Sequence, residues 1–337
     1  MLIFAVSVFT MNNTLFSNLN VNDQHTASSL SQCVNASHNN TAYTHTLTII
    51  GQAVTPYIVK GVLNKLTDVF NASSLSFHHL HQCLGDDVIE IRGVVNHADL
   101  ENVKPLLGDV SSAFNVDIGL QLSRPSLSKP GLLVMDMDST VIEIECIDEI
   151  AKLAGVGEQV AEVTAKAMRG EIAFNDSLIH RVACLEGVPV SHLDKIRDSL
   201  PIMPGIQRLL SELKKSNWKL AIASGGFTYF ADHLKQRLGL DFAISNILAV
   251  EGEKLTGKVE GEIVNADVKA RTVKTLAEKW DIPLSQTVAM GDGANDLVMM
   301  AQSALGVACH GKPLVNEKAD VAIRIGSLHS LLYFLDK

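Results

Sequence analysis

The chain has 337 residues, of which 47% are hydrophobic, and a formal net charge of -9 at pH 7. This length and apolar content suffice for two domains with a sizeable core. The acidic balance argues against non-specific nucleic-acid binding, and no stretch approaches the roughly 18 apolar residues of a membrane-spanning helix. The five cysteines are odd in number and lack zinc-site spacing, which is typical of a reducing compartment.

The N-terminal region lacks the pattern of a folded domain. Met1–Met11 is apolar, but no Lys or Arg precedes Lys60 and no cleavage site is evident, so we expect no signal peptide; Met11 is an alternative start. Residues 12–42 are rich in Asn, Ser, Thr and His. We therefore predict a disordered or loosely ordered leader over residues 1–42 of a soluble cytoplasmic protein.

Residues 43–121 have the pattern of a small α+β domain. Apolar spacing predicts strands over 46–50, 87–92 and 116–120 and helices over 56–70 and 100–114. A short strand near 79–84 would complete a β-α-β-β-α-β, ferredoxin-like order. In this order of elements, and in its position before the rest of the chain, the region resembles the ACT-type regulatory domains. The exposed sheet edge of such a domain is often covered by a second copy, so we expect a homodimer through this domain.

The histidine-rich stretch inside this domain invites a metal hypothesis. In the expected strand, His79, His81 and Cys83 would share one face, which superficially suits zinc. Three neighbouring strand positions give poor tetrahedral geometry without a fourth ligand. We interpret them as a polar sheet face.

Residues 122–130, which contain Pro125 and Pro130, predict a linker. The apolar run Gly131–Met135 then predicts a buried strand that ends in Asp136 and Asp138. At the carboxyl end of a parallel strand, both side chains point into the ligand crevice. Two such close carboxylates favour a shared hard cation such as Mg2+. The pair predicts a carboxylate nucleophile and a proton donor, although taken alone it also fits a solvated strand end.

Two further strand ends carry polar motifs. Leu220–Ala223 leads to Ser224-Gly225-Gly226, whose hydroxyl and N–H groups can bind phosphate oxygens. Val288–Met290 leads to the acidic, glycine-rich Gly291–Asp296, and Lys269 lies between the two motifs in the sequence. Each motif is weak alone, but this order of motifs is a strong joint signal.

The motifs resemble the haloacid dehalogenase-like superfamily of phosphatases, and residues 131–337 resemble its phosphoserine phosphatases. The matching segments are 136–140, 145–150, 167–170, 224–227 and 291–296. The resemblance implies an α/β fold with a Rossmann-like parallel sheet and a helical cap. The helical pattern over about 147–215 is too long for a simple crossover and agrees with such a cap.

The rest of residues 131–337 follows an alternating pattern. It predicts helices over 229–238 and 266–280, a hairpin-like stretch over 250–264 and strands over 219–224, 287–290, 305–308 and 321–323. Gly252–Val259 has the glycine and lysine spacing of a P-loop. It lacks the Ser or Thr after the lysine and leads into a strand-like stretch, so we reject a nucleotide-binding kinase.

The strand-end residues suggest roles in phosphoryl transfer. We expect Asp136 to be the nucleophile and Asp138 to protonate the leaving group and then take a proton from water. Asp136, Asp138 and Asp292 would hold Mg2+. For Asp138, the resemblance implies that the backbone carbonyl contacts the metal. Asp296 would support this site from behind, and Thr140 would order the loop or the phosphate. Phosphate would be bound by Ser224, Gly225, Lys269 and Asn295.

The cap would select the substrate. Glu145 can take an ammonium group, and Arg181 offers a fork that matches a carboxylate. On sequence alone, both fit ordinary surface charges equally well. The resemblance favours the binding roles and adds Met168 and Phe174 as apolar cap residues near the substrate.

The expected function is therefore Mg2+-dependent hydrolysis of O-phosphoserine to serine and phosphate, the last step of serine biosynthesis, through an aspartyl-phosphate. Another phosphatase or phosphotransferase of this fold, acting for example on phosphohomoserine, is an alternative. A second alternative is a non-catalytic protein that senses an amino acid. The presence of Asp136, Asp138, Lys269 and Asp292 argues against it. Because these groups lie between Asp136 and Asp296, we expect residues 126–337 to fold and act alone.

Overall fold

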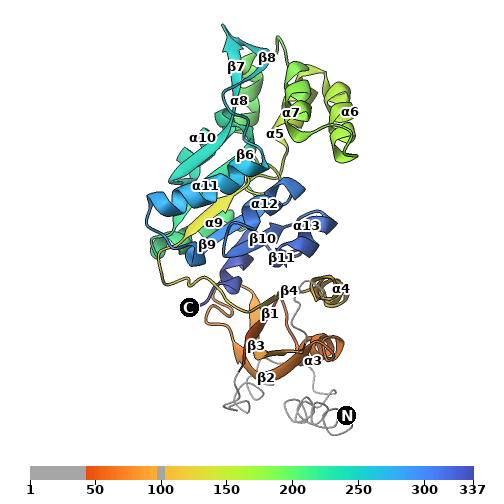
Figure 1. Cartoon of the computed structure of the whole chain (residues 1–337), viewed down its shortest axis with the longest axis vertical. Helices are drawn as coiled ribbons and strands as arrows, with labels where there is room; N and C mark the ends of the chain where they lie inside the picture. Colours follow the sequence, from red (N-terminus) through yellow and green to blue (C-terminus); the bar gives the residue numbers. More distant parts are fainter. Residues whose placement is uncertain (1–42, 97–102) are drawn as a thin grey trace.

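The computed structural model describes residues 43–96 and 103–337 and contains two β-sheets, one for each expected folded region (Figure 1). The leader predicted over residues 1–42 lies outside the described residues. Within the two described ranges, every helix is too short or too polar to span a bilayer.

The first sheet has four antiparallel strands in the order β2-β3-β1-β4. The chain order is β1(His45–Gly51), α3(Pro56–Lys65), β2(Phe70–Phe77), β3(Asp87–Val95), α4(Lys104–Phe114) and β4(Asp117–Gln121). Both helices contribute to an apolar cluster with the sheet, through residues such as Val62 and Leu107. The predicted ferredoxin-like order is confirmed.

The predicted position of the second strand is wrong. That strand is β2, at Phe70–Phe77, whereas residues 79–83 form turns. Most of β2 is small or polar, and a bulge after Ala72 breaks its alternation, so the period of two is hidden. The helix predicted to reach Phe70 ends at Lys65.

The shared strand face of His79, His81 and Cys83 is wrong for the same reason. His81 Nδ1 instead accepts the Val88 N–H at 3.0 Å. His78 Nδ1 accepts the Leu80 N–H at 3.1 Å. The histidines thus stabilise a turn.

The second sheet has seven strands in the order β11-β10-β9-β5-β6-β7-β8. They are β5(Leu132–Met135), β6(Lys219–Phe227), β7(Phe242–Glu251), β8(Lys254–Glu260), β9(Thr287–Gly291), β10(Leu305–Cys309) and β11(Val321–Ile323). All neighbours are parallel except β8, which forms an antiparallel hairpin with β7. The rejected P-loop stretch therefore lies in a hairpin. Because β6, β5 and β9 are adjacent and parallel, their carboxyl ends meet at one edge.

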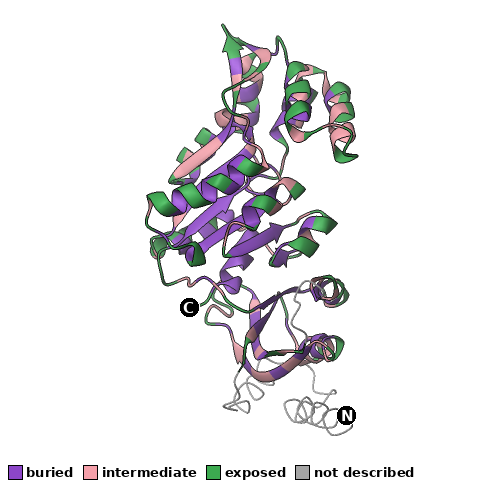
Figure 2. Ribbon diagram, viewed as in Figure 1, coloured by how far each residue is buried: buried purple, intermediate pink, exposed green. Residues whose placement is uncertain are grey.

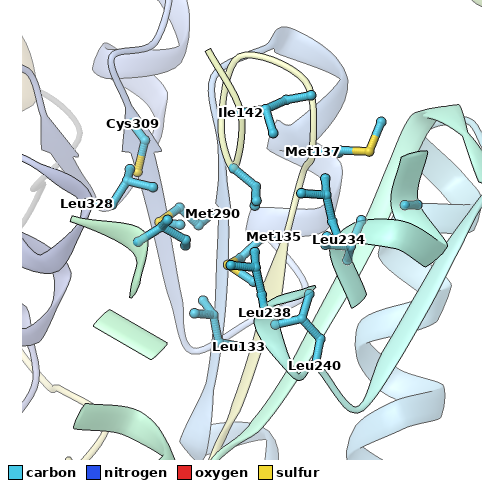
Figure 3. Close-up of a cluster of buried hydrophobic side chains, with 14 of the residues drawn as sticks. Leu133, Met135, Met137, Ile142, Leu234, Leu238, Leu240, Met290, Cys309 and Leu328 are labelled. Carbon is cyan, nitrogen blue, oxygen red and sulfur yellow. The ribbon is translucent and has the colours of Figure 1, made fainter. Parts of the chain in front are cut away.

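Helices cover both faces of this sheet, and the strands between them are buried (Figure 2). One face packs against α9(Ile206–Lys215), α10(Thr228–Leu238) and η4(Leu328–Phe334). Figure 3 shows part of this core, where Leu133, Met135 and Met290 gather with Leu234 and Leu238. The other face packs against α11(Ala266–Lys279), α12(Leu297–Met300) and α13(Pro313–Lys318).

Four helices between β5 and α9 form an insertion near the carboxyl edge of the sheet (Figure 1). They are α5(Cys146–Ala154), α6(Gly157–Met168), α7(Phe174–Ala183) and α8(Val190–Asp198). The insertion contacts the sheet's hairpin through α7 and β8. By contrast, α9 packs beside η4 at the sheet.

The two sheets are joined by a junction with buried polar contacts. The Asp117 carboxylate of β4 accepts the N–H groups of Arg324, Ile325 and Gly326 at 2.8, 3.1 and 2.8 Å. The Asp86 carboxylate accepts the Tyr333 hydroxyl at 2.9 Å, and His329 Nε2 lies 2.8 Å from it. The N-terminal domain is therefore docked through specific contacts.

Apolar packing completes the junction. A Cβ atom on Gly119 of β4 would lie 2.5 Å from a ring carbon of Phe334 and 2.9 Å from a methyl group of Val321. Only glycine lets the backbone of β4 approach these side chains so closely.

Candidate active site

A cavity of about 240 Å³ opens at the carboxyl edge of the second sheet, facing the helical insertion. Most site residues predicted from the sequence line it; Lys269 and Asp296, which form an ion pair beneath it, and Thr140 do not. The lining includes Asp136, Asp138, Glu145, Met168, Phe174, Arg181, Ser224, Gly225, Asp292 and Asn295. Residues far apart in the sequence thus share one cavity.

Asp136 and Asp138 lie in the loop that follows β5. The Asp136 N–H donates to the Met290 carbonyl of β9 at 2.9 Å, which fixes the start of this loop. The loop then turns back, because the N–H groups of Val141 and Ile142 donate to the Met137 carbonyl at 2.8 and 3.1 Å. The carboxylates are 7% and 8% exposed, so the cavity holds two carboxyl groups largely removed from water.

Lys269 is fully buried beneath these carboxylates. Its Nζ lies 2.8 Å from Asp136 Oδ1 and 2.7 Å from Asp296 Oδ1. Burial alone would lower the pKa of Lys269, but the two carboxylates outweigh it and raise that pKa. The ammonium group therefore stays charged and faces the predicted nucleophile.

Three carboxylates form a candidate metal site. Oxygens of Asp136, Asp292 and Asp296 lie within 4.8 Å of one another. Burial, followed by the charges of Asp136 and Asp296, raises the pKa of Asp292 to about 7. A divalent cation would relieve this repulsion, and an all-oxygen donor set suits a hard cation. The residues therefore fit a metal ion.

The composition of this cluster differs from the predicted metal set. Asp296 joins Asp136 and Asp292, whereas the Asp138 side chain does not. One Asp296 oxygen already contacts Lys269, and the other accepts the Gly293 N–H at 2.9 Å. Asp296 therefore holds Lys269 and its loop, and Asp136 and Asp292 have the freer oxygens.

Asp138 has the environment of a proton donor. Burial, together with the charges of Glu145 and Asp136, raises its pKa well above the ordinary range, while hydrogen bonds from Cys146 oppose this shift. The neutral carboxylic acid is favoured, which suits protonation of a leaving group.

The carboxyl end of β6, which contains Gly225 and Gly226, needs glycine for close approach. A Cβ atom on Gly226 would lie 2.5 Å from Met137 Cε and 3.0 Å from Asp138 Oδ2. A Cβ atom on Gly225 would lie 3.0 Å from the Phe174 ring. The Ser224 hydroxyl oxygen accepts the Gly226 N–H at 3.0 Å. Gly226 therefore lets the end of β6 lie against Asp138, and Gly225 leaves room for the Phe174 ring.

The insertion and its first connection supply charged side chains of both signs to the cavity. Glu145 precedes α5 and accepts the Ser139 hydroxyl at 2.9 Å; burial raises its pKa. Arg181 on α7 has a buried Nε without a hydrogen-bond partner among the described residues. Burial lowers the pKa of Arg181, but Asp148 and Glu145 oppose this effect. An unpaired guanidinium donor is costly unless a ligand accepts from it.

Apolar side chains frame the cavity. Phe174 packs its ring against Gly225, whereas Met168 is 71% exposed even though it lines the cavity. Thr140 Oγ1 donates to Asp292 Oδ1 at 3.3 Å, in agreement with a role in ordering the loop. Asp148, Thr164 and Lys312 also line the cavity and were missed in the sequence. Of these, Lys312 had one usable signal, its position just after a strand of the sheet.

A match to a family model agrees with this arrangement. Residues 131–304 match the model of the haloacid dehalogenase-like hydrolases. The chain belongs to this family.

Similar proteins within the family share one name. The chain is 53% identical to a phosphoserine phosphatase of Vibrio cholerae over 226 residues, which cover 67% of this chain and 69% of that protein. The structure of a probable phosphoserine phosphatase from Vibrio cholerae, in unliganded form, is 42% identical with a TM-score of 0.70 and covers 86% of each chain. A substrate-bound phosphoserine phosphatase complex is 38% identical with a TM-score of 0.59, covering 62% of this chain and 99% of that one.

Proposed function

We propose that this protein is a phosphatase that hydrolyses O-phosphoserine to serine and phosphate. One observation carries the proposal: a single cavity combines a buried pair of carboxyl groups with both an acidic and a basic side chain from the insertion. The carboxyl pair suits phosphoryl transfer, and the flanking charges suit an amino acid. The phosphoserine phosphatase of Vibrio cholerae, at 53% identity, supports the same function.

The reaction would proceed in two steps. The Asp136 carboxylate attacks phosphorus, forming an aspartyl-phosphate while the bond from phosphorus to the serine oxygen breaks. Asp138 gives its proton to that oxygen. Asp138 then takes a proton from water, which attacks phosphorus and releases phosphate and free Asp136. The raised pKa of Asp138 agrees with this order, because it favours the protonated acid.

Several groups would hold the phosphoryl oxygens during both steps. The Ser224 hydroxyl, the Gly225 backbone and Asn295 line the cavity, and the Lys269 ammonium group lies against Asp136. Fixed donors of this kind stabilise developing charge without reorganisation. When bound, Mg2+ would neutralise charge on the phosphate; Asp136, Asp292 and the Asp138 carbonyl would hold it.

Substrate choice would rest on the insertion. The Glu145 carboxylate would accept the substrate ammonium group, and Arg181, whose Nε is unpaired, would bind the carboxylate. Met168 and Phe174 would exclude water around the substrate carbon atoms. These contacts favour an amino-acid phosphate but do not set its chain length, so phosphohomoserine remains the main alternative substrate.

The N-terminal domain would act as an ACT-like regulatory domain in a homodimer. Its ferredoxin-like order and the position of β2 at the edge of the described sheet support this assignment. We propose residues 43–121 as this domain, 122–130 as the linker and 131–337 as the phosphatase domain. We also propose a cytoplasmic location and a place at the last step of serine biosynthesis.

The proposed function is tested by measuring phosphate release from a panel of substrates. The panel contains phosphoserine, phosphohomoserine, phosphothreonine and sugar phosphates, each with Mg2+ and with a chelator. We expect phosphoserine to have the highest kcat/KM and chelation to abolish turnover. A sugar phosphate as the best substrate would contradict the assignment of Glu145 and Arg181.

A further inference from the structure

We propose that Lys312 contacts the substrate and binds its phosphate group, as a cation additional to Lys269. This inference rests on the proposed phosphatase function. Lys312 lies in the short loop between β10 and α13, directly before α13, and this loop has none of the motifs that define the rest of the site. It nevertheless lines the cavity together with Asp292 and Asn295.

The backbone fixes Lys312 beside the metal-site loop. The Lys312 N–H donates to the Asp292 carbonyl at 3.2 Å. A Cβ atom on the preceding residue, Gly311, would lie 3.3 Å from the same carbonyl oxygen. The loop that follows β10 therefore packs directly on the loop that follows β9, so Lys312 is next to the phosphate side of the cavity.

Lys312 differs from Lys269, the other cation on the phosphate side of the cavity, in having no ion-pair partner. Lys269 is shared by Asp136 and Asp296. Among the described residues, no ion pair within 4.0 Å involves Lys312. Its side chain is exposed, and its charge opposes the raised pKa of both Glu145 and Asp292. The ammonium group is thus near the site and free to pair with an incoming anion.

The position of Lys312 favours phosphate over the substrate carboxylate. Arg181, the proposed carboxylate partner, belongs to α7 of the insertion, whereas Lys312 belongs to the edge of the sheet that holds Asp292. A flexible ammonium group acts as a point charge and suits a phosphate oxygen. The many carboxylates of the cavity repel a phosphate dianion, so an additional unpaired cation lowers that barrier.

The start of α13 is held rigidly, which limits the positions that Lys312 can take. Asn316 Nδ2 donates to the Gly311 carbonyl at 2.6 Å, and the Asn316 N–H donates to the Lys312 carbonyl at 3.0 Å. The Arg324 guanidinium donates to the Asn316 carbonyl at 3.1 Å. Asp117 of the N-terminal domain accepts the Arg324 N–H. The junction therefore supports the loop that carries Lys312.

The test uses Lys312→Met and Lys312→Arg in the full chain with two substrates, phosphoserine and p-nitrophenyl phosphate. The second is a phosphomonoester without ammonium or carboxylate groups. We expect Lys312→Met to lower kcat/KM by about tenfold to a hundredfold on both substrates. The inhibition constant of inorganic phosphate should rise in parallel, and Lys312→Arg should keep most of the activity.

Lys318→Met, at the other end of α13, is the matched control and should match the wild type. Because Lys312 is exposed, each variant should keep the wild-type Tm. Unchanged kinetics of Lys312→Met would overturn the proposal, and so would a loss on phosphoserine alone, since that would assign Lys312 to the amino-acid part. If the wild-type protein cleaved p-nitrophenyl phosphate but not phosphoserine, the proposed function would be contradicted. The comparison of Lys312→Met with the wild type on p-nitrophenyl phosphate would still test the role of Lys312.

Discussion

The active-site cavity and the junction between the two domains both bury carboxylates, but they stabilise them differently. In the junction, Asp117 accepts three backbone N–H groups, which oppose the rise in its pKa that burial causes. At Asp86, the hydrogen bonds from His329 and Tyr333 outweigh burial and lower the pKa. In the cavity, burial and neighbouring carboxylates raise the pKa of Asp138 and Asp292. The junction carboxylates are hydrogen-bonded within the protein, whereas the carboxylates of the cavity outnumber its cations.

This difference separates structural from functional buried charge. A carboxylate with complete hydrogen bonds contributes to stability and specificity of packing. A crowded carboxylate is costly in the free protein and is stabilised when a cation or substrate arrives. Substitutions in the cavity should therefore change activity more than stability, and substitutions in the junction should do the reverse.

The largest expected effect is on activity, from Asp136→Asn. The amide is isosteric but not nucleophilic, so turnover of phosphoserine should fall by a factor on the order of 1000 or more. Thermal unfolding should show no loss of stability, because one crowded charge has been removed. A variant that keeps substantial activity and still forms a phospho-enzyme would show that another residue is the nucleophile.

Arg181→Ala should act on selectivity. Losing a buried charge-assisted pair costs about 2–5 kcal/mol, mainly in kcat/KM for phosphoserine. Turnover of p-nitrophenyl phosphate should change far less. Steady-state kinetics on both substrates measure this difference, and equal losses would remove the proposed carboxylate contact.

Asp117→Ala should act on stability. It leaves three backbone N–H groups at the junction without their acceptor, so the free energy of unfolding should fall by about 2–4 kcal/mol. Urea denaturation gives the value, and Asp109→Ala, at an exposed position of α4, is the control. A loss under 0.5 kcal/mol would mean that water replaces these bonds at little cost.

The smallest effect concerns pH and the junction histidine His78. Burial, aided by the charge of His79, lowers the pKa of His78 to about 3. Below pH 6.5 the His78 side chain binds a proton in the unfolded chain but not in the folded chain. The contribution of His78 to the free energy of unfolding is therefore fully present above pH 6.5 and is lost progressively as the pH falls toward 3. At pH 5 the loss from His78 is about 2 kcal/mol.

His78→Gln should remove this part of the pH dependence. Denaturation at pH 7 and pH 5 should show a smaller change than in the wild type by about 2 kcal/mol. His79→Gln, at a more exposed position of the same turn, is the comparison. An identical pH dependence of His78→Gln and wild type would mean that His78 titrates normally in the folded protein.

The sequence predicted the second sheet well because its strands are short apolar runs with clear ends. β5, β9 and β10 differ from their predicted ranges by one residue at most at either end. In β2, Asn71 and three serines interrupt the alternation, and the strand was misplaced. Burial of β2 depends on partners far away in sequence, which local patterns do not contain.

Prediction of the candidate site from the sequence was limited in the same way, to residues that belong to a local pattern. Asp136, Ser224 and Asp292 could be identified because each follows a predicted strand in a recognisable motif. Lys312 also follows a strand, but a single lysine carries no pattern. The junction could not be predicted at all, since it joins Asp86 and Asp117 to the last turns of the chain. Whether residues 126–337 fold alone remains a prediction, and the buried Phe334 would then be uncovered.

The position of η4 has a consequence for protein synthesis. All seven residues of Leu328–Phe334 are buried, and η4 packs against β1, α9 and β11. The ribosome makes this segment after every element that it contacts. The N-terminal domain therefore leaves the ribosome long before its docking surface exists, and it waits with Gly119 and Asp117 uncovered. Stalled or prematurely terminated chains should thus be easily degraded, even when all the proposed catalytic residues have already been made.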